Sequence, residues 1–399
     1  MGERQVYLDY NATTPVLAAV KEAMLPYLDE RFGNPSSGHR FGRQAREAVE
    51  IARARVAALI GASPEEILFT SGGTESNNLA IRGAAAAIAE RAAVTGEPAS
   101  ISGAPAFPAA PGLVVTSAIE HPAVAGPCGF LEKSGWKVAR LAVDDSGRVD
   151  PARAGETIGE ETTLVTVMHA NNETGVLQPI QQVSALARQR GAPVHTDAAQ
   201  SVGKVPVQVD RLGVDLLSIA GHKLYAPKGV GALYIRRGTR ISPVLLGAGH
   251  ERGLRPGTEN VPAIVGLGEA CRIAAETLLQ EMERVRGLRD LLWELIARAV
   301  PGLLLNGHPE QRLPNTLNIR FPGVRGGAVL DQCPRMAAST GSACHEGGET
   351  PSAVITAMGI GPGEALGSVR LSLGRPTTED DVREAADELV EGWNRARRD

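Results

Sequence analysis

Short apolar runs alternate with helical stretches between about residue 67 and residue 235. Several runs are nearly unbroken by polar residues, as is typical of strands buried on both faces. Most spacers are long enough for crossover helices, so the pattern predicts a mainly parallel α/β sheet. The connection 224–231 is too short for such a crossover, so the last strand should run antiparallel to its predecessor. The six predicted strands are 67–70, 113–116, 164–167, 193–196, 216–219 and 232–235.

A different pattern begins near residue 264, where long helical periodicities dominate. They include 269–299 and a C-terminal helix opened by 377–380, whose hydroxyl and carboxyl groups suit a helix N-terminus. This region is expected to form a separate α+β domain. Residues 94–111 are rich in Ala, Pro, Gly and Ser without apolar periodicity, which predicts a mobile surface insertion.

Composition excludes several classes of partner. The chain has 399 residues, 43% hydrophobic and 22% charged, which is ordinary globular material for about two domains. Its net charge of -4, with both signs interspersed, gives no footprint for nucleic acid or an anionic membrane, so a small-molecule partner is expected. Residues 1–6 lack the apolar stretch of a secretory signal and no run approaches 18 apolar residues, which predicts a soluble cytoplasmic protein.

The four cysteines lie far apart and form no CxxC pair, which argues against a zinc site or a disulfide scaffold. Cys128 and Cys271 occur within helical patterns and are interpreted as packed small residues. Cys344 lies in the glycine-rich, polar stretch 341–349, where an accessible and partly ionised thiol is expected. Cys333 lies in a less polar context.

Polar residues that follow the predicted strands are candidates for function, because ligands of open parallel sheets bind beyond the carboxyl ends of the strands. After the first strand, 71–78 contains two glycines and leads into a helix, which fits either a phosphate cradle or a plain strand-to-helix turn. His121 follows the second strand, where a lone histidine is more often structural than catalytic.

Two further strand ends carry ionisable groups. Asp197, with Gln200 three residues on, could keep a pyridinium nitrogen protonated or could cap a turn. Lys223 could form a Schiff base with an aldehyde or could be a surface lysine in a loop. A phosphate cradle, a ring neighbour, a pyridinium partner and a Schiff-base lysine in one sheet together favour pyridoxal 5'-phosphate.

An ordered series of motifs resembles the cysteine desulfurases and selenocysteine lyases of the class V aminotransferase, fold-type I family. The resemblance implies a mainly parallel seven-stranded sheet in a large domain, residues 16–263. It also implies a smaller α+β domain, residues 1–15 and 264–399, which carries Cys344. The matching stretches are 7–15, 33–37, 70–78, 170–175, 195–200, 221–223, 255–260 and 341–344.

The resemblance assigns the residues around the cofactor ring. Lys223 resembles the Schiff-base lysine, Asp197 the pyridinium partner and His121 the imidazole stacked on the ring. Gln200 would contact the ring hydroxyl.

The resemblance also assigns the phosphate contacts. Gly73, Thr74 and His222 would hold the phosphate, and Thr258 would reach it from the other subunit of a homodimer. Ala220 stands where many desulfurases have a serine, so one phosphate hydrogen bond is lost or supplied elsewhere.

The substrate side is implied in the same way. Asn172, also a cofactor contact, and Arg370 resemble the pair that grips the substrate carboxylate, a task that suits the planar guanidinium. Lys223 and His121 would transfer protons, and Cys344 would accept sulfur from L-cysteine as a persulfide, leaving L-alanine. A sulfur-acceptor protein would then receive the sulfur.

Three alternatives remain open from sequence. Some features of the sequence look closer to selenocysteine lyases, which convert L-selenocysteine to alanine and selenide. These features are the residues at 255–258 and 343–345 and the 94–111 insertion. A catalytically weak scaffold for sulfur acceptors would not need Lys223 and Cys344. An aminotransferase or β-eliminase of the same fold would not need Cys344.

Overall fold

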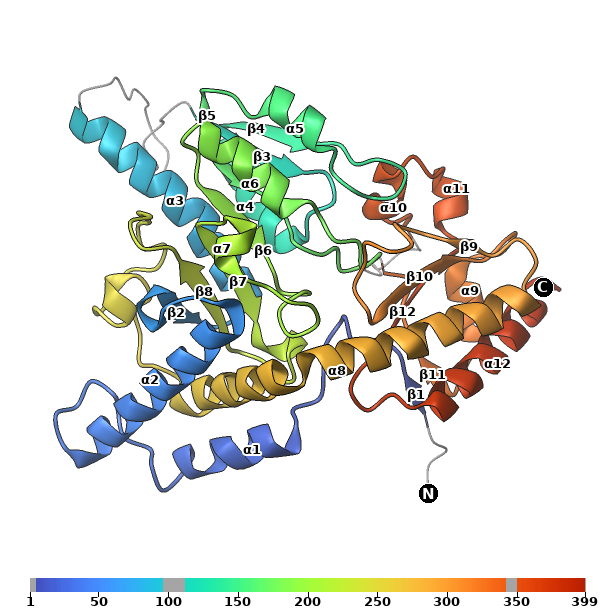
Figure 1. Cartoon of the computed structure of the whole chain (residues 1–399), viewed down its shortest axis with the longest axis horizontal. Coiled ribbons are helices and arrows are strands. Elements are labelled where there is room, and N and C mark those ends of the chain that lie inside the picture. The colour runs from blue at the N-terminus through green and yellow to red at the C-terminus, as the bar shows by residue number, and fades with distance from the viewer. Residues whose placement is uncertain (1–4, 96–111, 342–349, 399) are drawn as a thin grey trace.

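The computed structural model describes residues 5–95, 112–341 and 350–398. Figure 1 shows two lobes joined by the long helix α8 (Val261–Ala299). Most of the predicted 94–111 insertion and the whole of Cys344 lie outside the described residues. Residues 94 and 95 belong to the last turn of helix α3.

The large lobe contains a seven-stranded sheet. Strand β8 is antiparallel to both of its neighbours, and every other pair in the sheet is parallel. The mainly parallel sheet and the antiparallel last strand are therefore confirmed. The order across the sheet is β2 (Ile67–Thr70), β8 (Gly231–Ile235), β7 (Leu216–Ala220), β6 (Val194–Asp197), β5 (Thr162–Thr166), β3 (Leu113–Ser117) and β4 (Lys137–Leu141).

Strand β4 is absent from the six predicted runs. It is an edge strand that pairs with β3 alone, and only Leu141 of its five side chains is buried. A strand that is largely open to solvent does not produce a continuous apolar run, which is why the pattern missed it.

Helices cover both faces of the sheet. One core packs α2, α6 and the start of α8 against residues such as Val115 and Val165, and the other packs α3 and α4 against their neighbours Val114 and Leu164. Adjacent strand residues thus point into different cores, which explains the unalternating runs. The helices of this lobe are α1 (Ala18–Met24), η1 (Leu25–Tyr27), α2 (Arg40–Ile60), η2 (Pro64–Glu66), α3 (Gly73–Thr95), α4 (Pro122–Lys133), α5 (Pro151–Thr157), α6 (Ile180–Gln189), α7 (Val209–Leu212), η3 (Gly221–Lys223) and η4 (Glu251–Gly253).

The small lobe is built on two short sheets. Strand β10 (Thr316–Arg320) pairs antiparallel with β12 (Ser368–Ser372) and β9 (Leu304–Leu305), while β1 (Val6–Tyr7) pairs parallel with β11 (Met336–Ala337). The predicted C-terminal helix is α12 (Glu379–Ala396), and Thr378 and Asp381 form its capping box. The remaining helices are α9 (Gly326–Asp331), α10 (Ala353–Ala357) and α11 (Pro362–Ala365).

Helix α8 belongs to both lobes. Its residues up to Ala274 pack in a large-lobe core, and those from Val285 onward pack in the small-lobe core. It begins earlier than the predicted 269, at Val261, with the side chain of Asn260 accepting a hydrogen bond from the Ala263 N–H. The predicted boundary between 263 and 264 thus falls in its first turn, and the division into domains stays a prediction.

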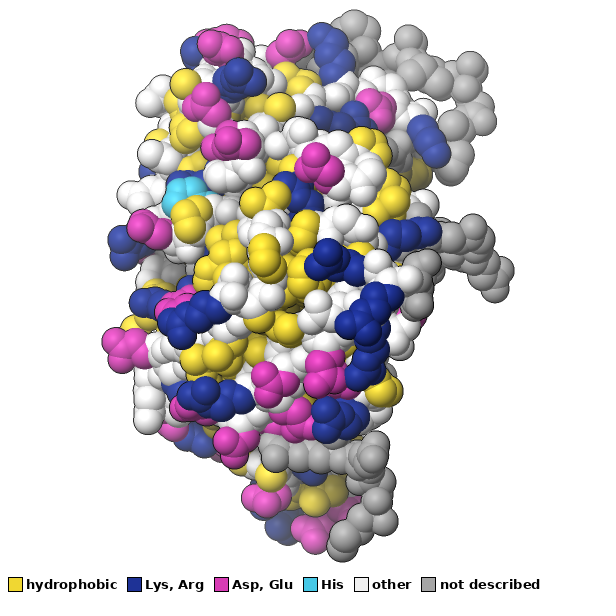
Figure 2. Space-filling view, turned by 90° about the vertical axis from the view of Figure 1, so that its right-hand side faces the viewer, with side chains coloured by type: hydrophobic (Ala, Val, Ile, Leu, Met, Phe, Trp, Pro, Cys, Tyr) yellow, Lys and Arg dark blue, Asp and Glu magenta, His cyan; other side chains and the backbone are white. Residues whose placement is uncertain are grey.

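The face drawn in Figure 2, on the side of the small lobe, carries charged side chains of both signs. In Figure 2 apolar side chains gather near the centre of the face, with charged side chains of both signs around them. Within the described ranges, no helix is long and apolar enough to cross a membrane.

Candidate active site

A cavity of about 380 Å³ opens at the carboxyl ends of the parallel strands. Residues from both lobes line it, because Arg370 lies on β12 and Asn11 follows β1. Most of the predicted site residues meet here: Gly73, Thr74, His121, Asn172, Asp197, Gln200, His222, Lys223 and Arg370.

Two predicted residues are not among the lining. Thr258 is exposed in the segment before α8 and does not line the cavity of its own chain. Cys344 lies outside the described residues.

The strand-to-helix connection after β2 has the form of an anion-binding turn. Gly72 has a φ of +146°, which favours glycine, and α3 begins at the next residue, so a helix N-terminus faces the cavity. The Ser71 N–H donates to the Glu75 carboxylate at 2.6 Å, which fixes the turn. Ala220 also lines the cavity, and its methyl group supplies no hydrogen-bonding group there.

Lys223 lies in the 3-10 turn η3 directly after β7. Its ammonium group donates to the carbonyl oxygens of Asn11 and Ala12. Burial lowers the pKa of Lys223 to about 8, and the positive charge of Arg370 adds to this effect. The neutral amine, which is the nucleophilic form, is therefore more populated near neutral pH than in an ordinary lysine.

Asp197 ends strand β6 with its carboxylate held by two donors. Asn77 Nδ2 donates to Oδ2 at 2.7 Å, and the Ala199 N–H donates to Oδ1 at 2.9 Å. Asn77 is fully buried on α3 and had no role assigned from sequence. It lies four residues after Gly73, hence on the same helix face, and this spacing is the signal that could have identified it.

His121 has the structural role considered from sequence, and it also lines the cavity. It is the N-cap of α4, and its Nδ1 accepts a hydrogen bond from the Ala123 N–H at 3.1 Å. Burial lowers the pKa of His121 and Lys223 lowers it further, while Asp197 opposes the shift. The ring is neutral near neutral pH and carries its proton on Nε2, since Nδ1 is an acceptor.

His222 stands beside Lys223 and is also neutral. Burial, followed by the charge of Lys223, lowers the pKa of His222 to about 4. Its Nδ1 lies 3.2 Å from Thr13 Oγ1. It therefore offers hydrogen bonds rather than a positive charge to an anion.

Arg370 is already partly paired. Its Nη2 donates to Asp9 Oδ1 at 2.7 Å and its Nη1 to the Asn172 carbonyl at 3.1 Å, while Nε has no partner among the described residues. An incoming carboxylate would share the guanidinium with Asp9 or displace it. Asp9 lies in the matching stretch 7–15 but had no role assigned to it.

Asn11 connects the two lobes at the cavity. It is buried, and its carbonyl oxygen accepts hydrogen bonds from Lys223 and from Gln200 Nε2. Its side chain accepts from Lys204 at 3.0 Å and from Asn315 at 3.1 Å. No sequence signal identifies this role of Asn11, because two of its contacts, those with Lys223 and Gln200, are made by its backbone carbonyl oxygen.

The three described cysteines are buried. Burial raises the pKa of each thiol, in Cys128, Cys271 and Cys333, to about 12. The packed positions predicted for Cys128 and Cys271 are confirmed, and none of the three lines the cavity.

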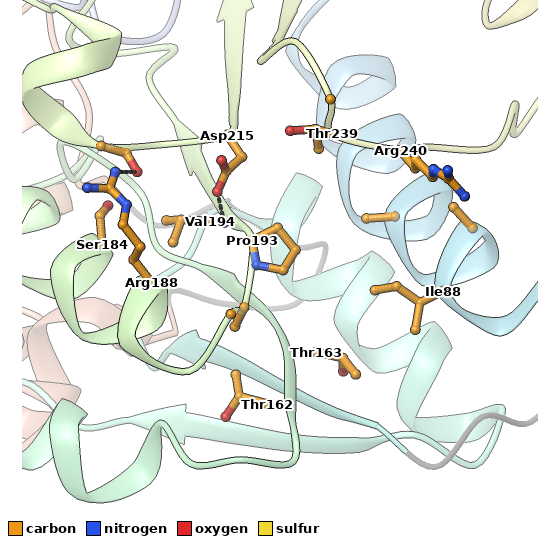
Figure 3. A pocket seen from close by; sticks show the side chains of 16 residues that line it. Ile88, Thr162, Thr163, Ser184, Arg188, Pro193, Val194, Asp215, Thr239 and Arg240 are labelled. Carbon is orange, nitrogen blue, oxygen red and sulfur yellow. Dashed lines mark hydrogen bonds between the residues drawn. The ribbon is translucent and has the colours of Figure 1, made fainter. Parts of the chain in front are cut away.

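A larger hollow, of about 800 Å³, lies at the opposite edge of the sheet. Figure 3 shows Thr162, Val194 and Asp215 there, at the amino ends of β5, β6 and β7. Asp215 accepts a hydrogen bond from the Val194 N–H at 2.8 Å, and Arg188 donates to the Gly213 carbonyl at 3.2 Å. These polar groups make hydrogen bonds to nearby backbone. The other side of the sheet, where the carboxyl ends of the parallel strands meet (the carboxyl edge), is therefore the better candidate for chemistry.

An amine of lowered pKa, a fixed carboxylate, an imidazole and a helix N-terminus surround one cavity of an α/β sheet. They define a site of the kind that binds a phosphorylated aldehyde cofactor. The chain belongs to the class-V aminotransferase family, whose model matches residues 6–384. The family and the fold expected from the sequence motifs are confirmed.

Curated proteins and solved structures agree with this membership. The chain is 45% identical over 389 residues to cysteine desulfurase IscS of Dictyoglomus turgidum, covering 97% of this chain and 94% of that protein. It is 45% identical to cysteine desulfurase 2 of Trichormus variabilis over 94% of this chain and 90% of that one.

Two solved structures extend the comparison. A NifS-like protein matches with a TM-score of 0.86 and 35% identity over 97% of this chain and 98% of its own. SspA in complex with cysteine matches with a TM-score of 0.78 and 37% identity over 92% and 98%.

Proposed function

We propose that this protein is a cysteine desulfurase that binds pyridoxal 5'-phosphate at Lys223 and converts L-cysteine to L-alanine. The sulfur passes to Cys344 as a persulfide. The observation that carries the proposal is Lys223, an amine with a pKa near 8 in the same cavity as the fixed carboxylate of Asp197. Two relatives named cysteine desulfurase, each 45% identical, support the choice of reaction.

The residues of the cavity fit this cofactor. The start of α3 at Gly73 and Thr74 suits the phosphate, Asp197 suits the ring nitrogen, and His121 presents a flat neutral ring. Two buried polar atoms of the lining, Asn77 Oδ1 and Arg370 Nε, have no partner among the described residues and remain available to a ligand.

When bound, the cofactor supplies an electron sink for the carbon skeleton of the substrate. Lys223 Nζ would hold the aldehyde of the cofactor and, as a free amine, could take a proton from the substrate α-carbon. Asn77 and Ala199 keep the Asp197 carboxylate in place. Arg370 binds the substrate carboxylate through the part of its guanidinium that Asp9 does not occupy.

The sulfur transfer balances without an external oxidant. The Cys344 thiolate attacks the substrate sulfur, so an S–S bond forms while the C–S bond breaks and its electron pair stays with carbon. Lys223 Nζ or His121 Nε2 delivers the proton that completes the alanine methyl group. Sulfur is oxidised from thiol to persulfide and carbon is reduced by the same two electrons.

A homodimer completes the phosphate site in this proposal. Thr258 is exposed and does not line the cavity of its own chain, which supports a role at the site of a second copy. The protein that accepts the persulfide and the cytoplasmic location stay predictions.

Alanine formation by the purified yellow holoenzyme tests the function. Wild type is expected to produce alanine from L-cysteine, and Lys223→Ala and Cys344→Ala should each lose at least about a thousandfold, since each removes a nucleophile. Cys271→Ala, which removes a buried thiol in α8, is the matched control and should retain activity. Full turnover by Cys344→Ala would contradict the persulfide step and favour an aminotransferase or β-eliminase.

Selenocysteine lyase is the second candidate, because the sequence at 255–258 and 343–345 looks closer to that class. The same assay with L-selenocysteine separates the two. Use of selenocysteine alone, or selenocysteine turnover that survives Cys344→Ala, would replace the desulfurase with the lyase. Absence of alanine from both substrates would leave the scaffold hypothesis.

A further inference from the structure

Lys204 lies next to the cavity without belonging to its lining. It is partly buried and lines a separate hollow of about 40 Å³. Its Nζ donates to Gln200 Oε1 at 2.9 Å and to Asn11 Oδ1 at 3.0 Å. The hydrogen bonds of Lys204 reach the cavity through these two partners, both of which line it.

The contacts of Gln200 determine which way its amide faces. The amide oxygen accepts from Lys204, and Nε2 donates to the Asn11 carbonyl at 3.0 Å. Turning the amide over would place its NH2 against the lysine donor and its oxygen against a carbonyl oxygen, which breaks both hydrogen bonds. One N–H of Nε2 then remains for a ligand, because a primary amide carries two.

We propose that Lys204 is a positioning residue that makes Gln200 present an N–H, rather than an oxygen, to the phenolic oxygen of the cofactor. The inference rests on the proposed function, because it requires pyridoxal 5'-phosphate in the cavity. It adds a residue that does not touch the cofactor and acts through one that does.

The electrostatic setting of Lys204 is consistent with this task. Burial lowers the pKa of Lys204 well below its usual value, and the charges of Lys223 and Arg370 lower it further. A neutral amine still has two N–H groups for the two oxygens, and the Asn11 carbonyl, which can only accept, also opposes the turned amide.

A donor on the phenolic oxygen changes a measurable property of the holoenzyme. The donor would draw electron density from the phenolic oxygen. That oxygen would then bind less tightly the proton that it shares with the nitrogen of Lys223. Loss of the donor should raise the pH midpoint at which the yellow absorbance band titrates, by about 0.5–1 pH unit for one hydrogen bond.

The test is a spectrophotometric pH titration of wild type, Lys204→Met, Gln200→Ala and the double variant. We expect Lys204→Met to raise the midpoint, and to add nothing in the Gln200→Ala background, since the two residues act in series. Lys137→Met, which removes a lysine from the exposed edge strand β4, is the matched control and should keep the wild-type midpoint.

Two results would overturn the inference. An unchanged midpoint in Lys204→Met, even with a lowered melting temperature, would make Lys204 purely structural. An equal shift with and without Gln200 would mean that Lys204 acts without Gln200, through Asn11 or through its charge. A wild-type holoenzyme with no yellow band would instead refute the proposed cofactor, so the two failures are distinguishable.

A second pair of variants covers the case in which Lys204→Met does not fold. Gln200→Glu keeps a partner for Lys204 but has no N–H, so its midpoint should rise, and an unchanged midpoint would contradict the orientation argument. Lys204→Gln keeps one donor and should lie closer to wild type than Gln200→Glu does. A midpoint as high as that of Gln200→Glu would mean that a donor at position 204 is not what orients the amide.

Discussion

The two edges of the seven-stranded sheet differ in what their charged groups do. The hollow at the amino ends of the strands (the amino edge) is the larger, yet Asp215 and Arg188 there bind neighbouring backbone groups, and Asp215 also pairs with Arg236 at 3.7 Å. At the carboxyl edge Lys223 has a lowered pKa, and Asp197 is oriented by Asn77. The comparison teaches that the volume of a hollow is a poor guide to function, and that ionisable groups converging from several elements are a better one.

Asp197→Asn tests most directly whether the carboxyl edge is the site of chemistry. The change keeps the size of the side chain and removes the negative charge expected to hold the proton on the cofactor ring. We expect kcat to fall by roughly 100-fold or more, the scale of removing one oriented electrostatic contact. Steady-state alanine production measures it, and a loss below about threefold would contradict the role of Asp197.

A smaller effect is expected when the orienting group is removed and the carboxylate is kept. Asn77→Ala deletes the 2.7 Å donor to Asp197 Oδ2, while the Ala199 N–H still holds Oδ1. A roughly tenfold loss of kcat follows from one hydrogen bond to a charged group. If Asn77→Ala and Asp197→Asn act through the same group, the double variant should be no worse than Asp197→Asn alone.

Glu120, which follows strand β3 at the carboxyl edge, should make the stability of the protein depend on pH. Burial raises the pKa of Glu120 to about 8, while its Oε1 accepts from Ser117 Oγ and the Met168 N–H. The native state keeps this proton while the unfolded state loses it near pH 4.5. The contribution of protonated Glu120 to the free energy of unfolding is therefore fully present below pH 4.5 and declines as the pH rises toward 8.

Glu120→Gln should remove that part of the pH dependence. Between pH 5 and pH 8 wild type should lose up to about 1 kcal/mol of unfolding free energy per pH unit relative to the variant, measured by denaturant titration. Parallel stability curves for the two proteins would show that Glu120 is already ionised in the native state.

The smallest effect is expected from the matched change at the amino edge, Asp215→Asn. Its amide oxygen can still accept from the Val194 N–H, so the strand end keeps its hydrogen bond. Activity should stay within about twofold of wild type and stability within about 1 kcal/mol. A loss as large as that of Asp197→Asn would erase the distinction between the two edges.

The sequence predicted the carboxyl edge of the large lobe well for a physical reason. Buried parallel strands leave continuous apolar runs, and the polar residue after each run marks a strand end, as it does for Asp197 and Lys223. Strand β4 left no such run because it is an exposed edge. Asp9 and Asn11 act through contacts between segments distant in sequence, which no local pattern records, whereas the spacing of Asn77 from Gly73 was a local signal.

Other expectations stay predictions. Thr258 was expected to reach the phosphate site of a second copy and does not line the cavity of its own chain, and Cys344 lies outside the described residues. Arg370 was expected to be available to a substrate carboxylate, and the structure adds a competitor, Asp9, that the motif did not indicate.

Helix α8 has a consequence for how the chain folds. A cut at the boundary between 263 and 264 would strip Ile264, Leu267 and Cys271 from the core against which the sheet folds. The large lobe expressed alone would expose an apolar face that α8 normally covers, and the small lobe would carry the same residues unburied. The unit of cooperative folding is therefore larger than either lobe, and neither should be a stable fragment when the chain is divided there.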